Sequence, residues 1–244
     1  MPVTVAPPIR ARFPVPDMLQ RGAANTLRCP ISESGVAVAP TSGTITITDG
    51  AGTVQVSAAT ATISSSVATY SYTPAATLQL GERWVVEWSL VTSTYGTLTF
   101  RNDAMLVRNL IYCPISVDDL WPLEPALQPS GSDAQTAMTV ADFDAKLEEA
   151  WITVQNRLIQ MGKRPYLVIG ANALREVVQH QTLVLVFRGL ETRLPNAYAE
   201  KANRYHALLE EAWTRARLTY DEADDGKPDE GRRAARPSAL WIGR

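Results

Sequence analysis

Apolar and polar residues alternate along much of the first half of the chain, with the period of two that is typical of β-strands. Ile45 and Ile47 are separated by threonines, and Val54 and Val56 are each followed by a polar residue. Asp49-Gly50-Ala51-Gly52 stands between the two runs, so the pattern predicts a β-hairpin. Further runs of this kind cover residues 67–73, 84–90 and 98–107. About seven short strands within residues 26–110 predict a small β-sandwich or barrel.

After residue 138 the apolar positions recur every three or four residues, which is the helical period. Thr139 is suited to be the N-cap of a first helix, with Asp142 at the third helical position and Gly162 just past the end. The apolar stripe of this helix consists of Phe143, Leu147, Ala150, Val154, Leu158 and Met161. We therefore expect a helix over residues 139–161 with one apolar face.

Two more helices are predicted, over residues 172–189 and 195–220. The earlier one contains five consecutive apolar residues, which cover every side of a helix: Leu183, Val184, Leu185, Val186 and Phe187. Such a run must be buried on several sides, either by this chain or by other copies of it. The later helix begins at Pro195, a residue that suits the first helical turn. Residues 139–220 are thus expected to form a three-helix domain.

Prolines mark the two segments that are expected to precede or connect these domains. Five of the first sixteen residues are proline, so no helical signal peptide is expected there. Residues 1–25 are predicted to form an extended arm, either solvated or packed on a neighbouring subunit. Residues 111–138 contain a short helical turn at 117–121 and then several prolines, which predicts a linker with a short helix.

Opposite charges are segregated at the C-terminus. Residues 221–231 contain six acidic residues and one lysine. A calcium loop is not expected there, because Ala223 and Arg232 occupy two of the required ligand positions. A solvated acidic turn after the last helix is the better interpretation.

The last thirteen residues, 232–244, contain no acidic residue. Arginines and a cluster of apolar residues characterise them: Arg232, Arg233, Arg236, Leu240, Trp241 and Ile242. This segment has three interpretations: it docks on a partner, it binds nucleic acid, or it is a solvated tail without function. The apolar cluster favours docking, and the neighbouring acidic block would repel nucleic acid.

Composition narrows the possible functions. The formal net charge of −2 argues against a protein that wraps nucleic acid, and 45% hydrophobic residues are typical of a globular chain. Cys29 and Cys113 are expected to be thiols, a disulfide between them being the alternative. His180 and His206 are expected to be partly exposed on helices, without a second ligand at zinc spacing.

No apolar run approaches the roughly 18 residues that a membrane helix needs, so no membrane partner is expected. Catalytic, phosphate-binding and dinucleotide-binding motifs are missing from the sequence. Asp118 and Asp119 are adjacent, and neighbours on a helix point about 100° apart, so they do not form a catalytic pair. We therefore expect no enzyme, no cofactor and no metal site.

Several packing patterns follow one another in an order that carries a family resemblance. The helical part contains Ala150-Trp151 and Leu158, Gly162-Lys163-Arg164-Pro165, Leu174-Arg175-Glu176 and Tyr205-x-x-Leu208-x-x-Glu211-Ala212. The β part contains Trp84-Val85-Val86-Glu87-Trp88-Ser89, Thr99-Phe100-Arg101-Asn102-Asp103-Ala104 and Asp118-Asp119-Leu120-Trp121. Over residues 26–244 the chain resembles tailed-bacteriophage head–tail adaptors, also called head-completion or neck connector proteins, of the kind with an N-terminal β-sandwich domain.

The resemblance implies a structural protein of the virion neck that is assembled in the host cytoplasm. Adaptors of this type form a dodecameric ring beneath the portal and extend its channel, through which genomic DNA passes without specific binding. They also bind the next tail or nozzle protein. Their C-terminal tail docks on the portal, which on this chain implies Arg232, Arg233, Arg236, Leu240, Trp241 and Ile242. Neighbouring copies in a ring would pack around Leu183–Phe187.

Together these observations predict an α+β chain, with a small N-terminal β-sandwich or barrel before a C-terminal three-helix connector domain and an extended tail. The expected boundaries are 1–25 for the arm, 26–110 for the sandwich, 111–138 for the linker, 139–220 for the helices and 221–244 for the acidic turn and docking tail. A β-sandwich adhesin or receptor-binding module with a helical oligomerisation region is the first alternative. An enzyme, the second, would need a pocket with titratable groups.

Overall fold

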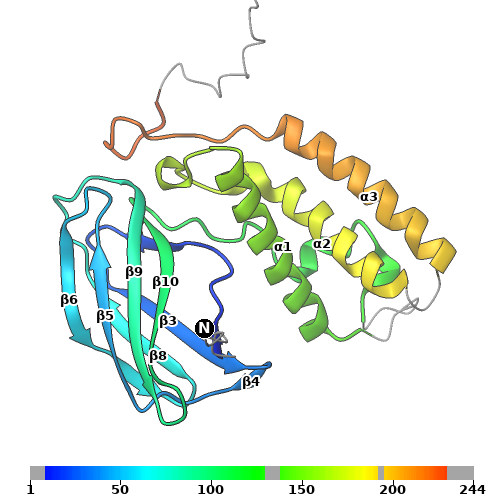
Figure 1. Ribbon diagram of the computed structural model, residues 1–244. Helices are drawn as coiled ribbons and strands as arrows, with labels where there is room; N and C mark the ends of the chain where they lie inside the picture. The colour runs from blue at the N-terminus through cyan, green and yellow to red at the C-terminus, as the bar shows by residue number, and fades with distance from the viewer. Residues whose placement is uncertain (1–8, 130–137, 192–194, 230–244) are drawn as a thin grey trace, which may run out of the picture. The chain divides into compact units, whose positions relative to one another are not determined.

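The structure is a computed structural model that describes residues 9–129, 138–191 and 195–229 (Figure 1). The chain divides into two compact units, Met1–Leu110 and Ile111–Arg244, which we call the β unit and the helical unit. Strands make up the first unit and helices predominate in the second. The expected mixture of α and β structure is therefore confirmed.

Two five-stranded sheets form the β unit within the described residues. One has the order β1-β3-β8-β7 with β4 paired to β3, and the other has the order β2-β10-β9-β5-β6. The strands are β1 (Ile9–Ala11), β2 (Asp17–Gln20), β3 (Asn25–Glu33), β4 (Val36–Ala37), β5 (Ser42–Thr48), β6 (Val54–Thr60), β7 (Thr62–Ser64), β8 (Val67–Tyr72), β9 (Gly81–Thr92) and β10 (Gly96–Val107). The predicted hairpin is confirmed as β5 and β6. Its turn is closed by the Asp49 carboxylate, which accepts the N–H groups of Ala51 and Thr53.

One hydrophobic core fills the space between the two sheets. Trp84, Val86 and Trp88 alternate along β9 and are buried in this core together with Leu27 and Ile31 of β3. The residues between them on β9 face outward, which is why the sequence shows a period of two. The buried tryptophans contribute the largest apolar areas to this packing.

Residues 9–25 belong to the β unit, whereas a separate arm was predicted over residues 1–25, of which residues 1–8 lie outside the described ranges. Strand β1 pairs antiparallel with β3, and β2 pairs parallel with β10, so the chain crosses from one sheet to the other. Ile9 and Leu19 are both buried in the core. The prolines at 14 and 16 lie in the crossing between the two strands, where no ladder N–H is needed.

Three α-helices form the helical unit within the described residues: α1 (Val140–Gln160), α2 (Arg175–Glu191) and α3 (Pro195–Arg215). The predicted start of α1 is confirmed. Thr139 accepts the N–H of Asp142, and the Asp142 carboxylate accepts the N–H of Thr139 at 2.7 Å. Gly162 follows the helix with a φ of +65°, as a C-terminal glycine should.

Helix α2 is the centre of the helical unit, because it packs against both α1 and α3 (Figure 1). The predicted stripe of α1 is buried except for its last member, Met161, which is exposed. Four positions of α3 are likewise buried: Ala202, Tyr205, Leu209 and Ala212. The amphipathic patterns of the outer helices therefore point toward α2.

Residues 115–127, predicted to lie in a linker, are packed into the helical unit. They form the 3₁₀ helices η1 (Val117–Leu120) and η2 (Pro125–Leu127), whose Leu120 and Leu127 are buried. The rings of Trp121 and Phe143 meet edge to face with centroids 5.1 Å apart. The short helical turn at 117–121 was predicted correctly. The prediction of a linker was wrong, because the apolar residues of this segment pack on the helices.

Asp17 is a carboxylate that the sequence analysis did not single out. It lies on β2 beside β10, where Asn102 donates a hydrogen bond to it at 2.9 Å. Burial raises the pKa of Asp17 to about 6, although the bond from Asn102 opposes the shift. The carboxyl group is therefore protonated more readily in the folded chain than in the unfolded one.

We expect Asp17→Asn to remove a pH-dependent loss of stability. A pKa raised from 3.8 to about 6 means that the free energy of unfolding falls as the pH rises between these values. At neutral pH the variant should be more stable by about 1–3 kcal/mol. Chemical denaturation at several pH values measures this slope. Asp103→Asn, at an exposed position of β10, should keep it, and an unchanged profile for Asp17→Asn would contradict the account.

Candidate functional site

The predicted portal-docking residues Arg232, Arg233, Arg236, Leu240, Trp241 and Ile242 lie outside the described residues. The segment that leads to them, residues 216–229, is described and runs away from the end of α3 (Figure 1). Helix α3 ends at Arg215, so the prediction of a helix to residue 220 was wrong. We call residues 216–229 the anchored segment for the reasons that follow.

Backbone hydrogen bonds fix the first part of the anchored segment to the helical unit. Val168 and Tyr220 form an antiparallel bridge. Ile169 N–H donates to the carbonyl of Thr219 at 3.0 Å, and Asp221 N–H donates to that of Leu167 at 2.9 Å. These bonds satisfy the backbone in an extended conformation, which is why the helix does not continue through residues 216–220.

Side chains fasten the same segment. The Tyr220 hydroxyl donates to the carbonyl of Lys163 at 3.0 Å, and burial raises the pKa of Tyr220. Arg164 lies over the Tyr220 ring, 5.7 Å from its centroid, and forms an ion pair with Glu222. Residues 163–169 thus hold the chain that leads to the tail by packing, hydrogen bonds and charge.

Residues 221–229 form a closed turn, which we call the acidic turn. The carboxylate of Asp221 accepts the N–H groups of Asp225 and Gly226, at 3.0 and 2.8 Å, and that of Asp229 accepts the N–H of Glu222 at 2.6 Å. Asp221 is buried, whereas we expected the whole turn to be solvated. Its carboxylate therefore has a structural role and ties the acidic turn together.

The predicted ring-packing run is buried by its own unit. Leu183, Val184, Val186 and Phe187 are at most 2% exposed, and Leu185 is half-buried. The Phe187 ring stacks between Tyr198 and Tyr205 of α3, with centroids 5.9 and 5.7 Å away. The burial that the sequence required is supplied within one chain, so this run no longer argues for contact between copies.

His180 is buried on α2, contrary to the expectation of a partly exposed side chain. Its ring lies 5.9 Å from that of Tyr205, and its Nδ1 atom is buried without a hydrogen-bond partner among the described residues. Burial lowers the pKa of His180, so the neutral form is favoured. The ring serves as packing in the interior of the helical unit, while His206 is exposed on α3.

A buried glutamate connects the segment before α1 to α3, and the sequence analysis missed it. Glu124 accepts a hydrogen bond from the Tyr205 hydroxyl at 2.9 Å and pairs with Lys201 at 2.6 Å. Burial and the bond to Glu124 raise the pKa of Tyr205. The tyrosine therefore stays protonated and donates to the carboxylate. No local sequence signal marks Glu124, because its partners are more than 75 residues away in the chain.

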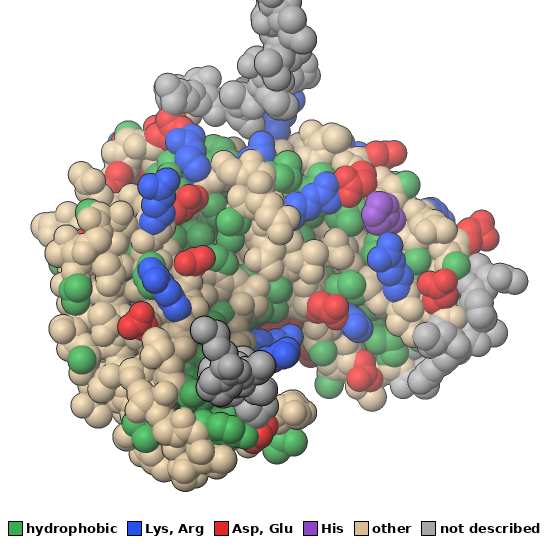
Figure 2. Space-filling model, viewed as in Figure 1, with side chains coloured by type: hydrophobic (Ala, Val, Ile, Leu, Met, Phe, Trp, Pro, Cys, Tyr) green, Lys and Arg blue, Asp and Glu red, His purple; other side chains and the backbone are tan. Residues whose placement is uncertain are grey.

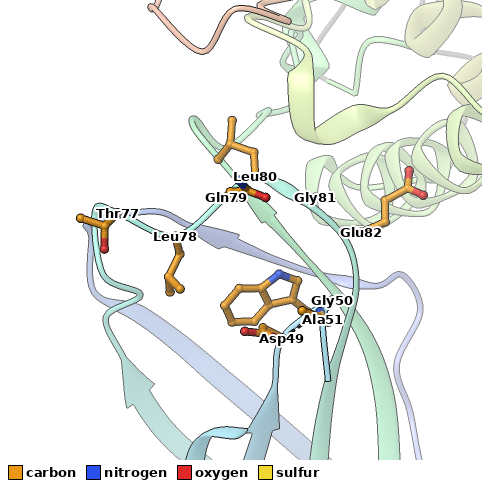
Figure 3. Close-up of a pocket in the computed structure, with 10 residues that line it drawn as sticks. Asp49, Gly50, Ala51, Thr77, Leu78, Gln79, Leu80, Gly81 and Glu82 are labelled. Carbon is orange, nitrogen blue, oxygen red and sulfur yellow. Dashed lines mark hydrogen bonds between the residues drawn. The ribbon is translucent and has the colours of Figure 1, made fainter. Parts of the chain in front are cut away.

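A hollow of about 470 Å³ opens at one end of the β unit (Figure 3). It is lined by the β5–β6 turn, by residues 77–82 and by the buried Trp84. The turn backbone comes so close to Glu82 that a Cβ on Gly50 would lie 2.6 Å from the Glu82 carbonyl oxygen. The Asp49 carboxylate is occupied by the turn and by Gln55, and the side chains of Leu80 and Glu82 point away from the turn (Figure 3). The hollow brings no nucleophile and base together.

Charged side chains of both signs are interspersed over the face shown in Figure 2. Among the described residues, no group of three or more His, Cys, Asp or Glu is placed to hold a metal ion. Cys29 and Cys113 are free thiols, as expected. None of the helices within the described ranges combines the length and apolar character that crossing a membrane requires.

Comparisons with known proteins add little to this picture. No family model matches the chain, and no curated protein matches it. Among solved structures, CopC from Methylosinus trichosporium OB3b matches 38% of this chain and 83% of its own, at 17% sequence identity and a TM-score of 0.29. A likeness this low carries no argument about function.

We expect Val186→Asp to unfold the helical unit. The side chain is fully buried, so an aspartate there would place an unpaired charge in the core at a cost of more than about 4 kcal/mol. Circular dichroism should show a large loss of helix. Leu185→Asp, at the half-buried position of the same run, should cost less, and a Val186→Asp chain with unchanged helix content would contradict the observed burial.

Asp221→Ala should loosen the anchored segment while the rest of the chain stays folded. The N–H groups of Asp225 and Gly226 would lose their acceptor, at a local cost of about 1–3 kcal/mol. Hydrogen exchange should accelerate across residues 216–229. Lys227→Ala, which alters an exposed side chain of the same turn, is the matched control. Equal exchange in the two variants would show that Asp221 does not organise the turn.

Proposed function

We propose that the chain is a structural virion protein, a head–tail adaptor that forms a ring beneath the portal, extends the DNA channel and attaches the tail. In this proposal the two packed sheets are the N-terminal β-sandwich domain and the helical unit is the connector domain. The order of the packing patterns along residues 26–244 is the basis of the resemblance. The partners would be the portal protein on one side and a tail or nozzle protein on the other.

The anchored segment is the single observation that carries the proposal. A tail that docks on a partner gains from leaving its own domain at a fixed point, because a short tether keeps it near the target once the first contact is made. The bridge between Val168 and Tyr220 and the turn closed by Asp221 supply such a point immediately before residue 230. A solvated tail without function would need no such fastening.

The proposed docking residues have the chemistry of interface anchors. Tryptophan and arginine are enriched among the residues that contribute most to binding, and Leu240, Trp241 and Ile242 form an apolar group between arginines. In a ring, several such tails would act together, so a weak single contact would give tight attachment. The location of the protein in the virion neck would follow from this contact.

Deleting residues 232–244 should abolish binding to the portal and leave both units folded. The test is co-sedimentation of the full-length and truncated chains with purified portal rings of the virus that encodes the chain. A chain whose residues 232–244 are scrambled keeps the tail's charge and composition, so it separates sequence-specific docking from charge alone. Circular dichroism checks that the truncated chain is folded.

Unchanged co-sedimentation of the truncated chain would overturn the docking role of the tail. Failure of the full-length chain to bind portal rings at all would overturn the adaptor proposal and favour the adhesin or receptor-binding alternative, which has no reason to contact a portal.

A further inference from the structure

An arginine groove lies on the helical unit, between the start of α2 and the end of α3. The groove has a volume of about 460 Å³ and is lined by Arg175, Arg215 and Arg217, with Glu176 beside them. Three arginines against one glutamate leave its walls with a net charge of +2. Small residues, among them Ala212, complete the lining and leave the space open.

The arginines of the groove differ in whether they form ion pairs with carboxylates. Arg175 pairs with Asp119, and Arg215 pairs with Glu176 at 2.9 Å, although both arginine side chains are more than half exposed. Arg217 is exposed and has no carboxylate partner among the described residues. The groove can therefore accept a further anionic group, and guanidinium groups bind carboxylates in a paired, directional geometry.

The acidic turn presents the complementary chemistry on the same unit. A hollow of about 470 Å³ on the acidic turn, different from the one on the β unit, is lined by Asp225, Lys227, Pro228 and Asp229. Asp225 is exposed, and one oxygen of its carboxylate accepts the N–H of Lys227, which leaves the other oxygen for a partner. Asp225 is thus the carboxylate of the acidic turn that is both exposed and able to accept a further hydrogen bond.

The acidic turn cannot reach the groove of its own copy. Backbone bonds at Thr219 and Tyr220 hold the chain extended along residues 167–169, between Arg217 and the turn. Figure 1 shows this segment running away from the end of α3. The arginine groove and the acidic turn therefore cannot meet within one chain, but they can meet between two copies.

We infer that the acidic turn of one copy docks in the arginine groove of the next copy. Such a contact uses two different surfaces. A pair of copies therefore still has one unoccupied groove and one unoccupied turn, and repetition of the contact generates a closed ring or an open helix. The inference rests on the ring of the proposed function and assigns the two surfaces that hold neighbouring copies of that ring together. The run Leu183–Phe187 cannot have this role, because it is buried within its own unit. A second copy is the occupant, because the complementary acid lies on this chain.

Sedimentation velocity of the full-length chain alone tests the contact. The wild-type chain should self-associate, and added salt should weaken the association, because these exposed charges are screened. Arg217→Glu and Asp225→Lys should each weaken it by about tenfold or more, since like charges then face one another. Arg204→Glu on α3 and Asp144→Lys on α1, both exposed and outside the two surfaces, are the matched controls and should leave it unchanged.

Mixing the two weakened variants gives the sharpest result. Asp225→Lys retains an intact groove and Arg217→Glu retains an intact turn, so an equimolar mixture should regain the association that each variant alone has lost, because the wild-type contact can form between the two. A mixture that stays monomeric would overturn the inference, as would a wild-type chain that is monomeric at every salt concentration. Circular dichroism of each variant checks its fold.

Portal binding, measured separately on the same variants, distinguishes the two proposals. Loss of self-association with portal binding retained supports the assigned contact and the adaptor function together. Portal binding by a chain that shows no groove-dependent self-association overturns the inference alone. Failure of the wild-type chain to bind portal rings overturns the adaptor function, whatever the outcome for self-association.

Discussion

The run Leu183–Phe187 in the middle of α2 is apolar on every side, so it must be covered on every side, and this constraint shapes the helical unit. Helices α1 and α3 each place one apolar face against α2. The buried Thr182 hydroxyl is satisfied within the helix, since it donates to the Val178 carbonyl at 2.7 Å. The arrangement of the unit follows from α2, and so does the absence of any need for other copies to bury it.

Local patterns could be predicted from the sequence because their causes are local. The capping of α1 by Thr139 and Asp142 involves residues three positions apart, and the β5–β6 hairpin is set by the turn that begins at Asp49. A run of consecutive apolar residues in a helix, such as Leu183–Phe187, likewise predicts burial from composition alone. What covers such a run is a question of tertiary packing, which is why burial was predicted and the covering surface was not.

The features that the sequence did not reveal depend on partners far away in the chain. Strand β2 is short and pairs with β10, so that Asp17 lies opposite Ala104. The buried Glu124 is stabilised by Lys201 and Tyr205, neither of which can be assigned to it from spacing. The arginines of the groove likewise come from separate parts of the chain: Arg175 from α2, Arg215 from the end of α3 and Arg217 from the anchored segment. The proposed docking tail was identified from composition alone, and the structure adds the anchored segment from which it leaves.

Opposite charges lie on separate surfaces at the arginine groove and the acidic turn, and in the proposed assembly this separation has a consequence. A chain with large charge of one sign repels its own copies, whereas a chain whose opposite charges lie on separate surfaces attracts them in a defined orientation. The anchored segment keeps the acidic turn from neutralising the arginine groove of its own copy, because its backbone is tied to residues 167–169. In the proposed assembly, the same backbone bonds therefore leave both charged surfaces available for the next copy.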